Sequence, residues 1–217
     1  KDIIDIFNFR FATKEFTGEI IPKEDMEMIA ETARLSPSSF GLEPWKFLIV
    51  ENKELIKEIS EVSWGFQRQA STTSHIVIAL TKAGSEVKYD SDYIRNLWIN
   101  TKGVSEEFFE GIKDVLKNFQ VGKLEADETN EKLLEWSKRQ TYIALGNMMT
   151  AAAMREIDSC AIEGFDKEKV EEILAKKGLL DKEKYELTYL IAFGYRKENP
   201  NRKKSRLPKS EVIQWVE

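Results

Sequence analysis

The fold of this chain is decided by the stretch Tyr142-Ile-Ala-Leu-Gly-Asn-Met-Met-Thr-Ala-Ala-Ala-Met154. The stretch is apolar on almost every side of a helix, and such a helix in a soluble protein must be buried on most of its surface. It is shorter than the ~18 apolar residues of a membrane span. We therefore predict a long buried central helix over about residues 127–156. Its small residues would let another backbone approach closely, so the helix could lie at a dimer interface or be buried within one subunit.

Four other apolar runs are typical of β-strands, because they are rich in β-branched and aromatic residues and end at polar residues or glycine. These runs are residues 45–50, 75–81, 159–162 and 185–194. Amphipathic helical patterns lie between them, and two of these patterns open with the candidate N-cap residues Asn52 and Asp166. Strands and helices alternate irregularly, with more helix than strand. This order predicts an α+β fold in which helices cover a small mixed β-sheet.

The chain has 217 residues, which fits one large or two small domains. No linker, internal repeat or low-complexity tract divides it, so we predict a single domain over residues 1–217. Residues 84–125 form an aromatic-rich helical insertion, either part of the core or a lid over a pocket, with core the more usual role. Residues 196–217 form a basic C-terminal segment.

Composition limits the chemistry that the chain can perform. One histidine, His75, and one cysteine, Cys160, cannot supply a His/Cys zinc site or an internal disulfide. Walker and G-x-G-x-x-G loops are missing from the sequence. His75 opens an apolar strand, so we interpret it as structural rather than as part of a catalytic triad. An enzyme of this composition would depend on a bound cofactor, and the single cysteine favours the cytoplasm.

Two basic features stand out in a chain whose net charge is -5. The first is Arg10-Phe-Ala-Thr-Lys14, and the second spans residues 196–209 and contains Lys204-Ser-Arg206. Alternate residues of an extended segment point the same way, so Lys204 and Arg206 could grip one phosphate. A solvated basic loop explains the same charges. Nucleic-acid binding is disfavoured by the net negative charge and by the lack of a known motif.

Four segments resemble the FMN-dependent nitroreductase family in their order and spacing, and together they cover nearly the whole chain. These segments are Arg10-Phe-Ala-Thr-Lys-Glu-Phe16, Ser36-Pro-Ser-Ser-Phe-Gly-Leu-Glu-Pro-Trp45, Ala161-Ile-Glu-Gly-Phe165 and Lys204-Ser-Arg-Leu-Pro208. The resemblance implies a homodimer with FMN at the subunit interface. It also implies transfer of electrons from NADH or NADPH, through flavin N5, to nitroaromatics, quinones or flavins in two separate half-reactions.

The resemblance further implies which residues hold the cofactor, and it assigns no metal site and no dedicated catalytic side chain. The FMN phosphate falls to Arg10, with its neighbours Phe11 and Ala12, and to Lys204 and Arg206. Lys14 would lie by the ribityl chain and the pyrimidine end of the ring. The remaining assignments are Pro37, Ser38 and Ser39 as a loop presented by the partner subunit, Gln67 and Gln69 at the pyrimidine edge, and Glu163 and Gly164 as the turn whose amide reaches N5.

Three departures from the family pattern bear on this assignment. Ala12 stands where many members have Ser, Gly41 replaces a frequent Asn, and Gln69 replaces a Lys near the ring. Two other functions stay open: a flavin carrier or sensor without turnover, and a module that binds an acidic partner through residues 196–209. The expected partners are a second copy of the chain and a small-molecule electron acceptor, without nucleic acid or membrane.

Overall fold

A four-stranded sheet forms the centre of the molecule, with the strand order β1-β2-β4-β3. The computed structural model describes residues 2–126 and 129–217. The strands are β1 (Trp45–Val50), β2 (His75–Lys82), β3 (Asp158–Ile162) and β4 (Tyr185–Gly194). All of the strand pairs in this sheet are antiparallel. The α+β class is confirmed, but the expected mixed sheet is corrected to an antiparallel one. Among the described residues, parallel pairing is confined to an isolated bridge between Ala12 and Ser159.

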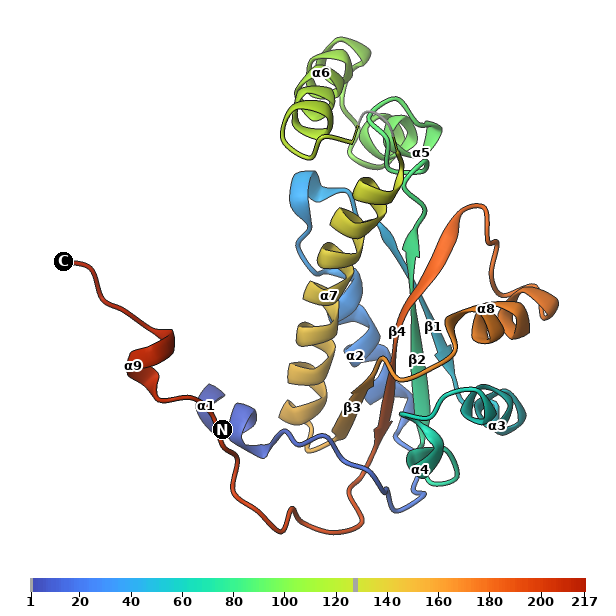
Figure 1. Cartoon of the computed structure of the whole chain (residues 1–217), viewed down its shortest axis with the longest axis vertical. Helices are drawn as coiled ribbons and strands as arrows, with labels where there is room; N and C mark the ends of the chain where they lie inside the picture. The colour runs from blue at the N-terminus through green and yellow to red at the C-terminus, as the bar shows by residue number, and fades with distance from the viewer. Residues whose placement is uncertain (1, 127–128) are drawn as a thin grey trace.

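Helices cover both faces of the sheet (Figure 1). Every residue of β2 is buried, and alternate residues of this strand enter different cores. Ile76, Ile78 and Leu80 pack against α3 (Lys53–Glu61) and α8 (Lys167–Lys176). Val77 and Ala79 pack on the opposite side against α2 (Lys23–Arg34) and α7 (Glu131–Met154).

The two N-caps predicted from the sequence are confirmed. The Asn52 side chain accepts a hydrogen bond from Leu55 N at 2.8 Å, and the Asp166 side chain accepts one from Lys169 N at 3.2 Å. The other helices are α1 (Ile3–Phe9), the 3₁₀ turn η1 (Ser39–Gly41), α4 (Gln67–Ala70), α5 (Asp92–Asn96), the π-turn η2 (Leu97–Thr101), α6 (Glu106–Gly122) and α9 (Lys209–Val212).

Helix α7 is the predicted central helix, although the expected start near residue 127 lies outside the described residues. Its sheet-facing side is buried, as Ala144, Met148 and Ala152 are completely enclosed. The opposite side is open in this chain: Ile143 is 40% exposed and Met154 is 59% exposed. Within the described parts of the chain, no helix is long and apolar enough to cross a membrane.

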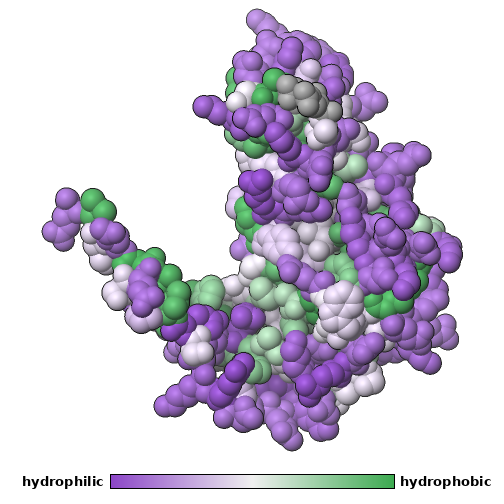
Figure 2. Space-filling view, viewed as in Figure 1, coloured by the Kyte–Doolittle hydropathy of each residue, from purple (hydrophilic) through white to green (hydrophobic). Residues whose placement is uncertain are grey.

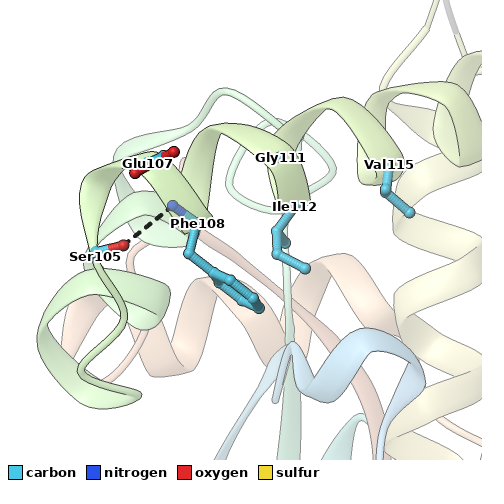
Figure 3. A pocket seen from close by; sticks show the side chains of 6 residues that line it. All are labelled: Ser105, Glu107, Phe108, Gly111, Ile112 and Val115. Carbon is cyan, nitrogen blue, oxygen red and sulfur yellow. Dashed lines mark hydrogen bonds between the residues drawn. The ribbon is translucent and has the colours of Figure 1, made fainter.

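The insertion at 84–125 forms α5, η2 and α6 at one end of α7, whereas α1 lies toward the other end (Figure 1). Its apolar residues join a separate core cluster in which Phe109 and Leu116 are buried against Trp136. Other side chains of α6 stay open. Phe108 and Val115 are both more than half exposed and line a shallow pocket along one side of the helix (Figure 3). The insertion therefore adds its own small core to the end of α7.

Candidate functional site

A small basic pocket joins two segments that lie nearly 200 residues apart in the sequence. It is lined by Arg10, Phe11 and Ala12 from the first segment and by residues 202–206 from the second, and its volume is about 170 Å³. Its lining residues are cationic, neutral or apolar, and none is a carboxylate. We call this site the basic pocket. The structure thus brings together the residues that the sequence assigns to the phosphate.

Lys204 holds the two sides of the basic pocket together. Its ammonium group donates hydrogen bonds to the backbone carbonyls of Phe7 and, at 2.7 Å, of Arg10. These carbonyls lie at the end of α1, where a lysine complements the negative end of the helix dipole. Burial lowers the pKa of Lys204, and repulsion from Arg10 and Arg206 lowers it further. Cations that repel one another in this way favour an anionic ligand.

Two further cations of the 196–209 segment are engaged elsewhere. The Arg196 guanidinium pairs with Asp158 at 2.7 Å, and the Lys197 ammonium pairs with Glu15 at 2.6 Å. Neither residue lines the basic pocket. Both residues belong to the basic feature predicted over residues 196–209. Their carboxylate partners lie far away in the sequence and could not be predicted from it.

Lys14 and Gln69 meet at the side chain of Cys160, and we call these three residues the Cys160 cluster. Lys14 Nζ lies 3.3 Å from Cys160 Sγ, and Gln69 Nε2 lies 3.4 Å from the same sulfur. Cys160 and Gln69 are buried, whereas Lys14 is largely exposed. Gln67, two residues before Gln69, is exposed on α4. The sequence placed Lys14 and Gln69 near one another but did not identify Cys160 as their common contact.

The Glu163–Gly164 turn directly follows β3 and is pinned by backbone bonds. Gly65 N donates to Gly164 O at 2.7 Å, and a Cβ on Gly164 would lie only 2.8 Å from the Trp64 indole nitrogen. A side chain at position 164 would displace the Trp64 indole and crowd the Gly65 backbone, which would lie 3.1 Å from its Cβ. Trp64 is 69% exposed at this turn, and we predicted no role for it from the sequence.

The Glu163 carboxylate faces α7, where it accepts a hydrogen bond from the Tyr142 hydroxyl. Partial burial and the neighbouring Glu163 carboxylate raise the pKa of Tyr142, so this hydroxyl stays protonated and remains a donor. This bond ties the turn after β3 to the exposed side of the central helix.

The loop that carries Pro37, Ser38 and Ser39 packs on α7. Ser39 N donates to Gln140 Oε1 at 2.8 Å, and Asn147 Nδ2 donates to Ser36 Oγ at 2.8 Å. Next to it, Phe40 has a left-handed backbone with φ of 55°. The family resemblance implies that this loop contacts the cofactor of a partner subunit. The contacts of the loop with α7 do not test that assignment, which stays a prediction.

Known proteins resemble this chain in sequence and in fold. A Bacillus subtilis protein provisionally named NAD(P)H nitroreductase YfkO is 43% identical over 215 residues, which is 99% of this chain and 97% of that protein. A provisionally named NAD(P)H:FMN oxidoreductase from Staphylococcus epidermidis has a TM-score of 0.78 at 22% identity, covering 100% of this chain and 96% of that one. A provisionally named nitroreductase from Exiguobacterium sibiricum, solved in complex with FMN, has a TM-score of 0.75 at 21% identity, with coverage of 100% and 98%.

The profile of the nitroreductase family matches residues 8–195, a span that runs from the end of α1 to just beyond β4. Together with the relative that is 43% identical over nearly the whole chain, this match decides the family. The chain belongs to the nitroreductase family.

Proposed function

We propose that this chain is an NAD(P)H-dependent flavin oxidoreductase that holds FMN between the basic pocket and the Cys160 cluster. The observation that carries the proposal is the basic pocket itself. Arg10 comes from one segment and Lys204 and Arg206 from another, and they converge in a pocket lined by no carboxylate. Burial lowers the pKa of Lys204, and repulsion from Arg10 and Arg206 lowers it further. A phosphate monoester is the ligand chemistry that relieves this repulsion.

The residues present fit the other parts of FMN as well. Lys14 offers a cation and Gln69 an amide. Among the described residues, the Lys14 ammonium and the Gln69 amide nitrogen both contact a sulfur, which is a weak acceptor. A flavin carbonyl oxygen is a better acceptor for these two donors. When bound, FMN supplies the redox chemistry, taking electrons from NAD(P)H and passing them to an acceptor in a second half-reaction. The chain's residues bind and orient the cofactor and tune its electrostatics.

We propose nitroaromatics, quinones or flavins as the acceptors. Trp64 is the aromatic residue placed to contact an acceptor beside Gly164, because its indole already packs on that turn and is largely exposed. Most aromatic residues of the insertion at 84–125, Trp98, Phe109 and Phe119 among them, pack instead around the far end of α7, whereas Phe108 is exposed there. Within one subunit, Trp64 rather than that insertion would shape the acceptor side of the site.

We also propose that the chain is an obligate homodimer with two FMN sites. The supporting observation is apolar surface on α1, on the open side of α7 and along the projecting C-terminal segment (Figure 2). The exposed residues include Ile3, Ile4, Phe7, Ile143, Met154, Leu207, Ile213, Trp215 and Val216. A second copy would cover this surface and would receive the loop at 37–39. Sedimentation mass with flavin content tests this, and a stable monomer that retains FMN would contradict it.

The redox function is tested by purifying the protein, recording its visible spectrum and identifying the released flavin by chromatography. We expect about one FMN per subunit and loss of the oxidised-flavin absorbance on anaerobic addition of NADH or NADPH. A bound FMN that neither dinucleotide reduces would support the carrier or sensor function. A colourless protein that binds acidic partners through residues 196–209 would support the third function instead.

A further inference from the structure

Asp158 and Arg196 form an ion pair outside the residues that line the basic pocket. Asp158 opens β3 and is 1% exposed, and Arg196 follows the end of β4. Arg196 Nε and Nη2 donate to the two carboxylate oxygens at 2.9 and 2.7 Å, and the Arg196 backbone N donates at 3.1 Å. A two-pronged contact of this kind fixes the orientation of both side chains.

The same pair binds the segment that carries Arg10 and Lys14. Thr13 Oγ1 donates to Asp158 Oδ1 at 2.9 Å, and Arg196 Nη2 donates to the carbonyl of Phe9 at 2.8 Å. The guanidinium also lies 4.2 Å from the centroid of the Phe9 ring. The residue directly before Arg10 and the residue directly before Lys14 are therefore attached to one buried carboxylate and its arginine.

We propose that the Asp158–Arg196 pair is a positioning unit for the cofactor phosphate. It fixes the segment with Arg10 and the start of the segment with Lys204 and Arg206 in one register, although neither member of the pair lines the pocket. This inference rests on the proposed FMN function. Two segments without regular structure would otherwise have to be ordered when the phosphate binds, so fixing them beforehand strengthens phosphate binding.

The test compares FMN with riboflavin, which has the same ring and ribityl chain but no phosphate. The full-length protein is dialysed to equilibrium against both flavins in equal amounts, and the bound flavins are separated by chromatography. We expect Asp158→Asn to lower the bound FMN-to-riboflavin ratio on the order of tenfold, because the two cationic segments lose their common anchor. A purely structural pair would change melting temperature and leave this ratio at the wild-type value, which would overturn the inference.

A milder pair of variants decides the matter if Asp158→Asn fails to fold. Thr13→Val removes one hydrogen bond to Asp158 and should lower the ratio severalfold, whereas Thr13→Ser keeps the hydroxyl and should restore it. Ile59→Val, in the core on the α3 side of the sheet, is the control for lost stability and should leave the ratio unchanged. If Thr13→Val also leaves the ratio unchanged, the inference is wrong.

The outcome for the wild-type chain separates this inference from the proposed function. A wild-type protein that takes up neither flavin, or both flavins equally, overturns the FMN phosphate site itself. A wild-type protein that prefers FMN, with variants that keep the same preference, overturns only the positioning role of Asp158 and Arg196.

Discussion

Arg10 and Lys14 lie four residues apart, yet they present their charges in contrasting surroundings. Arg10 lines a pocket together with Lys204 and Arg206. These cations repel one another, and none of the residues that line the pocket is a carboxylate. Lys14 is a single cation whose ammonium rests on a buried sulfur beside a neutral amide. The comparison suggests a division of labour along one short segment: the first end sets how tightly FMN is held, and the second sets how readily it is reduced.

The largest expected effect is on affinity at the first end. Arg206→Ala should weaken FMN binding by about 2–3 kcal/mol, or roughly 30- to 150-fold, because the phosphate loses a charged two-pronged donor. Lys209→Ala is the matched control, since Lys209 belongs to the same basic segment but does not line the pocket. Flavin fluorescence titration measures both. Equal losses in the two variants would mean a diffuse basic patch and would remove the first half of the comparison.

The next effect is on potential at the second end. Lys14→Met should lower the FMN midpoint potential by about 20–40 mV, equivalent to ~1–2 kcal/mol for a two-electron couple. The reason is that the Lys14 ammonium stabilises the more negative, reduced cofactor over the oxidised one. Gln69→Lys should raise the potential, and both variants should still bind FMN. Spectroelectrochemical titration checks this. Weakened binding in Lys14→Met at an unchanged potential would make Lys14 an anchor like Arg10.

A smaller change should follow from the sulfur. Cys160→Ala removes the atom that both Lys14 and Gln69 approach, so the ammonium loses its fixed position while keeping its charge. The potential should shift by less than about half of the Lys14→Met change, because a hydrogen bond to sulfur is weak. Cys160→Ser, which keeps an acceptor, should stay close to wild type in the same titration. A larger shift in Cys160→Ala than in Lys14→Met would show that the sulfur acts directly.

The smallest effect is a pH dependence confined to the first end. The pKa of Lys204 is lowered by burial and by Arg10 and Arg206, so this lysine loses its proton at a lower pH than an ordinary lysine. Phosphate binding requires the charged form. FMN affinity should therefore be highest at neutral pH, where Lys204 is charged, and fall severalfold as the pH rises through the lowered pKa of Lys204. Riboflavin affinity should show no such fall, and Lys204→Arg should abolish it. Parallel falls for both flavins would place the titrating group elsewhere.

The parts of the fold that could be predicted from the sequence are those encoded locally. The strand at 185–194 was predicted with both of its ends, because its β-branched and aromatic run stops at a glycine. The caps at Asn52 and Asp166 followed from residue type and position alone. The direction of strand pairing was not encoded locally. It depends on how α7 returns the chain to the sheet, and the prediction of a mixed sheet was wrong for that reason.

The site divides in the same way. The family resemblance of the sequence motifs assigned Arg10, Lys204 and Arg206 to one phosphate, and these residues line one pocket. Asp158 was missed, because a single aspartate at a strand start looks like any solvated acid until Arg196 is found across 38 residues. Trp64 was missed because its position over the Glu163–Gly164 turn depends on packing between loops far apart in the sequence.

The bonds from Lys204 to Arg10 and from Arg196 to Phe9 join residues 194 and 187 positions apart. A ribosome makes the first partner of each bond long before the second. During most of synthesis the nascent chain therefore carries Arg10 and Lys14 without the groups that complete the basic pocket. Contacts of such long sequence separation also form late in folding. Closing the long loop costs conformational entropy before the contact contributes any stabilising energy. FMN should accordingly bind only after residues 196–206 have been translated. The segments made earlier would then fold without help from a bound flavin.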